Sequence, residues 1–158
     1  MNEKIKQSCL VLGIGNSGRQ DDGLGWEFLH LLEQQNLSHV VCEYRFQLQI
    51  EDAELLNSFH DVIFVDASRT HYDNGFYWEI AKPSNQYSFS THSLKPETIL
   101  FLSENLYNHR PNSYILGIEG YEWELYNGIS KKANGNLKKA YNFLLNEIFI
   151  PWHLYQKE

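Results

Sequence analysis

The chain has 158 residues, 42% of them hydrophobic, and a formal net charge of −7 at neutral pH. This length and apolar content predict one globular domain spanning residues 1–158. The acidic side chains are spread along the chain, which argues against nucleic acid as a partner because nucleic-acid-binding proteins carry a basic patch.

Two features of the sequence predict the compartment. Cys9 and Cys42 are the only cysteines, and both lie in apolar, strand-like runs, so we expect buried, reduced thiols. Residues 1–7 are polar and contain lysine, with no long apolar stretch behind them. We therefore expect no signal peptide, no membrane span and a cytoplasmic protein.

The hydrophobic pattern predicts strands that alternate with helices, which is typical of an α/β fold with a mostly parallel sheet. Ser130 is expected to cap the last helix and Pro151 to stop it. In chain order we predict strands at 8–14, 40–46, 62–65, 76–81 and 113–118, and helices at 23–35, 51–58, 95–106 and 131–148.

One predicted strand breaks the parallel pattern. The strand at 76–81 follows the turn signal Asn74-Gly75. The segment between it and the strand at 62–65 is too short for the crossover that a parallel neighbour needs. We therefore expect these two strands to be antiparallel.

The most specific motif lies between residues 11 and 25. Gly13, Gly15 and Gly18 match G-x-G-x-x-G, the fingerprint of a dinucleotide site. Such a site needs a helix that begins directly after the glycines and holds the pyrophosphate at its N-terminus. Here the acidic pair Asp21-Asp22 intervenes, and carboxylates repel a phosphate but suit a metal ion. The motif therefore favours metal binding, with a dinucleotide-binding enzyme as an alternative.

Three residues are candidate ligands of that metal. Asp22 follows the first strand and Asp66 ends the third, and ligands of open α/β sheets gather at the carboxyl ends of strands. His92 follows a loop at 82–91 that extends to roughly 33 Å, enough to return to that edge. Two carboxylates and an imidazole suit nickel, zinc or manganese and leave coordination positions open. We assign Asp21 to capping the following helix.

These residues resemble those of the hydrogenase maturation proteases, endopeptidases that trim the C-terminus of the nickel-iron hydrogenase large subunit. The resemblance implies a doubly wound, three-layer α/β/α sandwich of the phosphorylase/hydrolase-like kind, around a five-stranded, mostly parallel sheet with one antiparallel strand. It rests on Leu12-Gly13-Ile14-Gly15-Asn16, Asp21-Asp22-Gly23-Leu24-Gly25, Val65-Asp66-Ala67 and His92.

The resemblance also implies roles for individual residues. Asp22 and Asp66 would be the catalytic carboxylates and, with His92, the metal-contacting groups. The loop would be shaped by Gly13, Gly15, Asn16, Gly23 and Gly25. In this family the nickel belongs to the immature large-subunit precursor, which is the substrate, and ions such as zinc or cadmium can occupy the site. We expect this precursor as the partner of a monomeric protein, with no nucleic-acid or membrane partner.

The loop after the second strand departs from many family members, because it lacks their glycine-containing turn. Its Gln47-Leu48 pair resembles the variant in proteases that serve bidirectional, cytoplasmic, NAD-linked hydrogenases. Gln47, Leu48 and Glu51 are the expected substrate-recognition loop. Two further alternatives are a nickel-sensing binding or chaperone module without proteolysis, and a metal hydrolase of small peptides.

Overall fold

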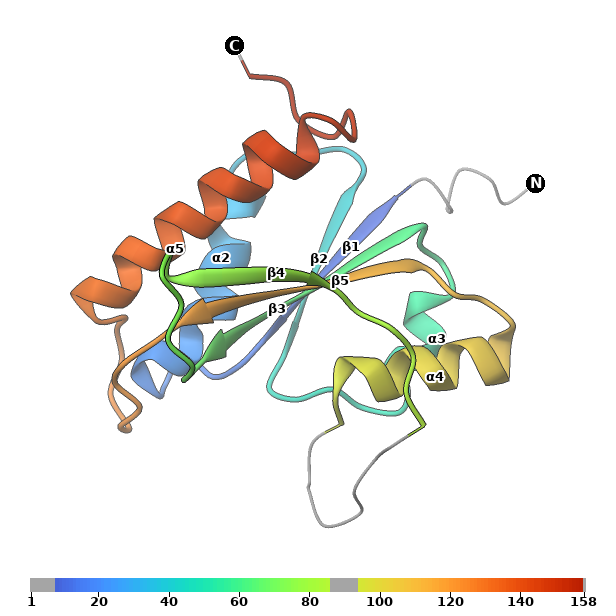
Figure 1. Cartoon of the computed structure of the whole chain (residues 1–158), viewed down its shortest axis with the longest axis horizontal. Coiled ribbons are helices and arrows are strands. Elements are labelled where there is room, and N and C mark those ends of the chain that lie inside the picture. Colours follow the sequence, from blue (N-terminus) through green and yellow to red (C-terminus); the bar gives the residue numbers. More distant parts are fainter. Residues whose placement is uncertain (1–7, 86–93, 158) are drawn as a thin grey trace.

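A five-stranded sheet lies between two layers of helices (Figure 1). The computed structural model describes residues 8–85 and 94–157. The strands are β1 (Cys9–Ile14), β2 (Val40–Arg45), β3 (Asp61–Ser68), β4 (Phe76–Ile80) and β5 (Asn112–Glu119). Their order is β2-β1-β3-β5-β4, and all neighbours are parallel except β4 and β5. The predicted α/β class is confirmed, with one antiparallel strand.

Helices cover both faces of the sheet and enclose two hydrophobic cores. One face is covered by α2 (Leu24–Glu33) and α5 (Lys131–Phe143), and the other by α3 (Asp52–Leu56) and α4 (Pro96–Tyr107) (Figure 1). Side chains alternate between these cores along β1, as expected for a strand buried on both sides. No helix among the described residues is long and apolar enough to span a membrane.

The strand order creates a crevice between β1 and β3. The chain passes from β1 to β2 on one side of it and then returns to β3 on the other side. Such a reversal opens the carboxyl edge of an α/β sheet to ligands. The two strands pair in register, with Ile14 opposite Asp66. Residues that follow β1 therefore lie beside the end of β3.

One strand prediction needs correction, and another holds in direction although the strand pairs with a different neighbour. The third strand continues to Ser68, so Asp66 lies inside it rather than at its end. The strand at 76–80 is antiparallel in direction but pairs with β5, which lies between it and β3. The strand β5 is largely buried, which suits a central position in the sheet. The strand β4 ends in Glu79 and Ile80, which are exposed, and therefore suits the edge of the sheet.

The two predicted helix caps have different outcomes. The Ser130 hydroxyl accepts a hydrogen bond from the Ala133 amide, which confirms the cap of α5. The prediction that Asp21 caps α2 is wrong. A single 3₁₀ turn, η1 (Gln20–Gly23), precedes α2, whose N-cap is Gly23 without a side-chain cap. The carboxylate of Asp21 is used elsewhere, because tertiary contacts compete for it.

The last helix changes its winding before it ends. After Phe143 it continues as a π-helical segment, η2 (Leu144–Phe149), with Leu144, Leu145 and Phe149 still buried. The apolar stripe predicted to run to residue 148 is therefore real, and Pro151 follows its end.

Replacement of Gly25 by alanine should destabilise the fold by about 2–3 kcal/mol. A methyl group there would lie 2.6 Å from the carbonyl oxygen of Val65 and 2.7 Å from that of Ile14, so α2 would have to move off the sheet. Urea unfolding followed by circular dichroism measures the change.

Gly135→Ala is the matched control, because Gly135 is also helical but an added methyl meets no atom within 4 Å. We expect it to raise the free energy of unfolding by about 0.5–1 kcal/mol. Equal effects of the two substitutions would contradict the close contact between α2 and the sheet.

Candidate functional site at the carboxyl edge of the sheet

The glycine loop after β1 packs closely against the backbone of Asp22. Gly15 has φ +148°, and a Cβ there would lie 2.0 Å from the carbonyl oxygen of Asp22. The Asn16 amide donates to that same oxygen at 3.0 Å, and the Gly18 amide donates to Oδ1 of Asn16 at 2.9 Å. The space that the glycines leave is therefore filled by protein, which disfavours the dinucleotide alternative.

Asp21 and Asp22 lie in different surroundings. Asp21 is completely buried. Its carboxylate accepts hydrogen bonds from the amides of Tyr121 (2.7 Å), Glu122 (3.0 Å) and Ser130 (2.7 Å), and from the Ser130 hydroxyl (2.8 Å). These bonds attach the loop after β1 to the loop between β5 and α5. Asp21 therefore has a structural role that its sequence context does not reveal.

Asp22 and Asp66 line one open pocket of about 420 Å³ at the carboxyl edge of the sheet. Both carboxylates are partly buried. The structure thus brings together two of the three predicted site residues, because β1 and β3 are paired neighbours. The pocket is completed by Arg19, Ala67, Ser68, Arg69 and Trp123.

Burial raises the pKa of Asp66 to about 7, and the negative charge of Asp22 adds to this effect. The hydrogen bond from the Ala67 amide, at 2.8 Å, acts in the opposite direction. Burial also raises the pKa of Asp22, against the lowering influence of Arg19 and Arg69. A carboxylate with a pKa near 7 can gain and lose a proton at neutral pH, which is the property of a general base.

The predicted nitrogen ligand, His92, lies outside the described residues. Within residues 8–85 and 94–157, no three His, Cys, Asp or Glu side chains are grouped to hold a metal ion. Asp22 and Asp66 are oxygen donors that would fit a divalent ion bound with further ligands. His71 is engaged elsewhere, since its Nδ1 lies 3.2 Å from Glu119.

The predicted recognition loop follows β2, the neighbour of β1, and so lies at the same edge of the sheet. Gln47 and Glu51 are exposed, whereas Leu48 is 2% exposed and forms a bridge with Leu94. An ion pair of 3.0 Å between Arg45 and Asp52 spans the loop.

The sequence did not predict that two apolar side chains of this loop are exposed. Phe46 and Ile50 are 69% and 60% exposed. The hydrophobic pattern of the sequence alone did not distinguish these two side chains from side chains of the core.

Sequence reasoning also missed three residues of the pocket. Arg69 follows β3 directly, Arg19 lies inside the glycine motif, and Trp123 comes from the loop between β5 and α5. Arg19 carried a signal through its position between the glycines and the acids. Trp123 carried none, because it is brought to the pocket only by the packing of distant loops.

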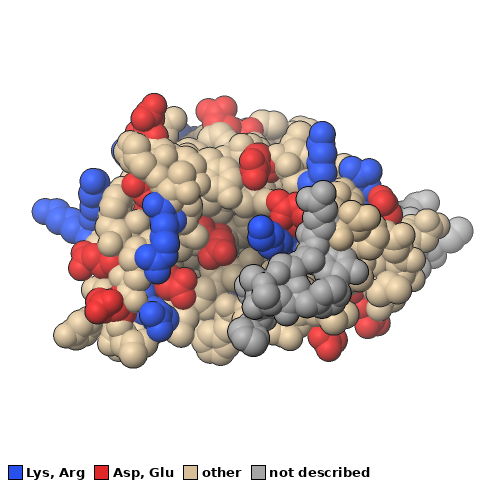
Figure 2. Space-filling view, turned by 60° about the horizontal axis from the view of Figure 1, so that its bottom comes forward, with Lys and Arg blue, Asp and Glu red and all other residues tan. Residues whose placement is uncertain are grey.

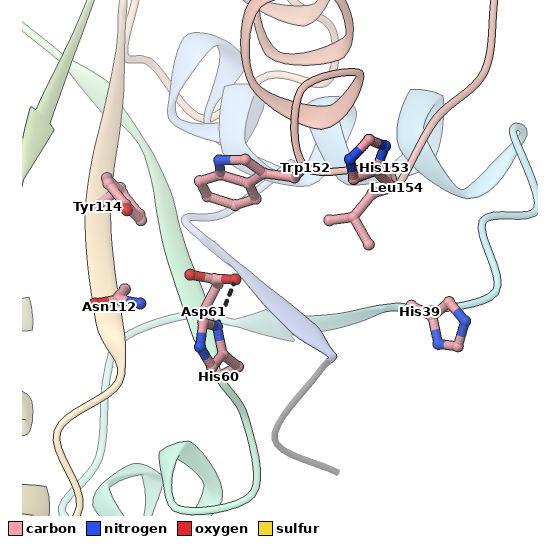
Figure 3. Close-up of a pocket in the computed structure, with 8 residues that line it drawn as sticks. All are labelled: His39, His60, Asp61, Asn112, Tyr114, Trp152, His153 and Leu154. Atoms are coloured by element: carbon pink, nitrogen blue, oxygen red, sulfur yellow. Dashed lines mark hydrogen bonds and ion pairs between the residues drawn. The ribbon is translucent and has the colours of Figure 1, made fainter. Parts of the chain in front are cut away.

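A second cavity, of about 550 Å³, lies at the amino edge of the sheet (Figure 3). It is lined by His39, His60, Asp61, Asn112, Tyr114, Trp152, His153 and Leu154. Among the residues drawn, the only polar contact is between His60 and Asp61, at 3.0 Å. Its histidines do not converge, and its edge is opposite to the one at which α/β folds bind ligands.

Charged side chains of both signs share one face of the molecule. Figure 2 shows acidic and basic side chains interspersed on the face that it presents, and no broad basic patch is formed there by the described residues.

Comparison with known proteins identifies similar folds. No protein-family model matches the chain, and no curated protein sequence is significantly similar to it. Among solved structures, the hydrogenase maturating endopeptidase HybD from E. coli is 18% identical with a TM-score of 0.67, covering 91% of this chain and 93% of its own.

Two archaeal structures are similar to the same degree. The hydrogenase maturation protease HycI from Thermococcus kodakarensis is 19% identical with a TM-score of 0.66, over 93% of this chain and 92% of its own. A hydrogenase 2 maturation peptidase from a Thaumarchaeota archaeon is 18% identical with a TM-score of 0.65, over 89% and 97%. The fold is therefore that of the hydrogenase maturation peptidases over nearly the whole chain.

Asp66→Asn should stabilise the metal-free protein at alkaline pH. The pKa of this carboxyl is higher in the folded than in the unfolded state, so the wild-type protein loses stability as the pH rises from about 4 to about 7. The amide removes this penalty, which amounts to at most about 4 kcal/mol above pH 7. Urea unfolding at several pH values measures it, and a difference that stays constant between pH 4 and 8 would contradict the raised pKa.

The two neighbouring acids should respond differently to alanine. Asp21→Ala leaves three backbone amides and a hydroxyl without their acceptor at a completely buried position and should cost about 3–5 kcal/mol. Asp22→Ala should change stability by less than about 1 kcal/mol, because no hydrogen bond to its carboxylate is formed by the described residues. Thermal unfolding of both variants tests this contrast, and similar melting temperatures would refute it.

Proposed function

We propose that this protein is an endopeptidase that removes the C-terminal extension of a nickel-iron hydrogenase large subunit after nickel insertion. The observation that carries the proposal is the pair Asp22 and Asp66, which share one open pocket at the strand-order reversal of the sheet. Support also comes from three solved structures of similar fold that are named hydrogenase maturation peptidases or proteases.

In this proposal the substrate brings the nickel ion, and Asp22, Asp66 and His92 complete its coordination. The nickel polarises the scissile carbonyl or lowers the pKa of an attacking water. Asp66, whose pKa is raised by burial in the metal-free protein, accepts the proton of that water. Burial raises the pKa of Asp22, and the two arginines oppose this effect and favour the charged form that a metal ligand needs. Zinc or cadmium would replace nickel at the same ligands.

The loop after β2 is the proposed contact with the large-subunit precursor. Gln47 and Glu51 are exposed and available to a partner, and Leu48 anchors the loop in the core. We propose that the substrate belongs to a bidirectional, NAD-linked hydrogenase, on the basis of the Gln47-Leu48 pair. The protein would act in the cytoplasm as a monomer.

Asp66→Asn should abolish cleavage of a nickel-loaded large-subunit precursor, by at least about a hundredfold in rate, because the amide cannot accept the proton. Mass spectrometry of the mixed proteins detects the loss of the C-terminal fragment. Asp73→Asn is the matched control, since Asp73 follows the same strand but is fully exposed, and it should cleave like the wild type.

The outcomes separate the alternatives. A wild-type protein that binds the nickel-loaded precursor without cutting it would be a nickel-sensing binding module. Normal processing by Asp66→Asn would show that the site assignment is wrong. Stability measured on the same variant excludes unfolding as the cause of a lost activity.

A further inference from the structure

Two guanidinium groups lie beside the acid pair without a carboxylate partner. Arg19 and Arg69 line the same pocket as Asp22 and Asp66. Neither forms an ion pair within 4.0 Å with any acid in the described parts of the chain. The other basic side chains of the structure that lie near acids, such as Arg45 and Arg110, do form such pairs. Both cations influence the charge of Asp22, but neither is held by an ion pair with it.

Trp123 holds both arginines in place. The guanidinium carbon of Arg69 lies 4.2 Å from the centre of the Trp123 ring, which is a cation–π contact. Nη2 of Arg19 donates to the carbonyl oxygen of the same tryptophan at 3.4 Å. The stacking engages one face of the Arg69 guanidinium, and its N–H groups donate to no described residue. Within residues 8–85 and 94–157 these donors are therefore not used by the protein and can be offered to a ligand in the pocket.

The loop that carries Trp123 is itself tightly attached. The Asp21 amide donates to the carbonyl of Glu122 at 2.9 Å, and the Gln20 amide donates to that of Tyr126 at 2.8 Å. The buried Asp21 carboxylate accepts hydrogen bonds from the amides of Tyr121 and Glu122 in the same loop. Both arginines are thus positioned on a preformed framework, which reduces the entropy lost when a ligand binds.

We propose that Arg19 and Arg69, held by Trp123, form a subsite that binds a carboxylate of the peptide substrate. The planar fork of N–H donors on arginine matches a carboxylate in two parallel hydrogen bonds. A singly charged group is favoured over a phosphate dianion, because Asp22 and Asp66 lie in the same pocket. The inference rests on the proposed function only in that the ligand is a peptide.

The subsite would fix the position of the peptide chain relative to Asp66. A charged anchor beside the reacting groups restricts how the chain can slide through the pocket. Arg19 and Arg69 would then be specificity-determining residues that act on binding. Their removal should raise KM by a larger factor than it lowers kcat.

Peptide binding tests the subsite without any cleavage. Three peptide probes with capped N-termini are compared. The first has a glutamate side chain and an amidated C-terminus, and the second is polyalanine with a free C-terminal carboxylate. The third has a glutamine side chain and an amidated C-terminus. Titration followed by the indole N–H signal of Trp123 in NMR should show binding of a carboxylate probe and none of the glutamine probe. Whichever carboxylate probe binds more tightly identifies the source as side chain or chain terminus.

The variants define the contribution of the arginine. Arg69→Gln should weaken binding of the carboxylate probe about tenfold, and Arg69→Lys by less, because an ammonium keeps the charge but loses the fork. Arg110→Gln is the matched control, an exposed arginine at the end of α4, and should bind like the wild type. Equal binding of the glutamine probe, unchanged binding by Arg69→Gln, or tighter binding of inorganic phosphate would each overturn the subsite.

Processing of the nickel-loaded precursor separates this inference from the proposed function. A wild-type protein that binds the carboxylate probes but cuts no precursor contradicts the protease proposal and leaves the subsite standing. A wild-type protein that cuts the precursor, together with an Arg69→Gln variant of unchanged KM, contradicts the subsite and leaves the protease proposal standing.

Discussion

The buried carboxylate of Asp21 is the interaction on which the geometry of the site depends. It accepts four hydrogen bonds from the loop between β5 and α5 and sits on the turn directly before α2. A fully buried charge is tolerated only when it is satisfied in this way. Because the backbone is fixed at Asp21, the next residue, Asp22, is directed to the pocket. The same bonds attach the loop that carries Trp123, which contacts Arg19 and Arg69 in the pocket.

The pocket combines opposite electrostatic demands in a small volume. Burial raises the pKa of both carboxyl groups, to about 7 for Asp66, while the two guanidinium groups counteract this effect at Asp22. Two carboxylates in different environments can therefore differ in protonation at one pH, which separates a proton acceptor from a ligand. The arginines also offset the negative charge of the acids, so that an anionic peptide is not repelled from the site.

The periodicity of hydrophobic residues predicted all five strands and the four helices to within a few residues at most ends. Periodicity did not predict that β5 lies between β3 and β4. The strands β4 and β5 have similar local patterns, and only their burial decides which of the two is central. The acid pair was recognised from its position after a strand, and Asp66 from a carboxylate in an apolar run. Which member of the pair reaches the pocket depends on hydrogen bonds with residues about a hundred positions away in the chain.

The sequence by itself determined the α/β class, the glycine turn after β1 and the two acids near the carboxyl edge of the sheet, because these follow from local patterns. Spacing, periodicity and the restricted conformations around glycine act over a few residues and can be recognised in a single chain. The tertiary structure alone decided that Asp21 is structural, that Leu48 is buried and that Trp123 holds Arg19 and Arg69 beside the acids. These outcomes depend on contacts between β1, β3 and the β5–α5 loop, which local sequence does not encode.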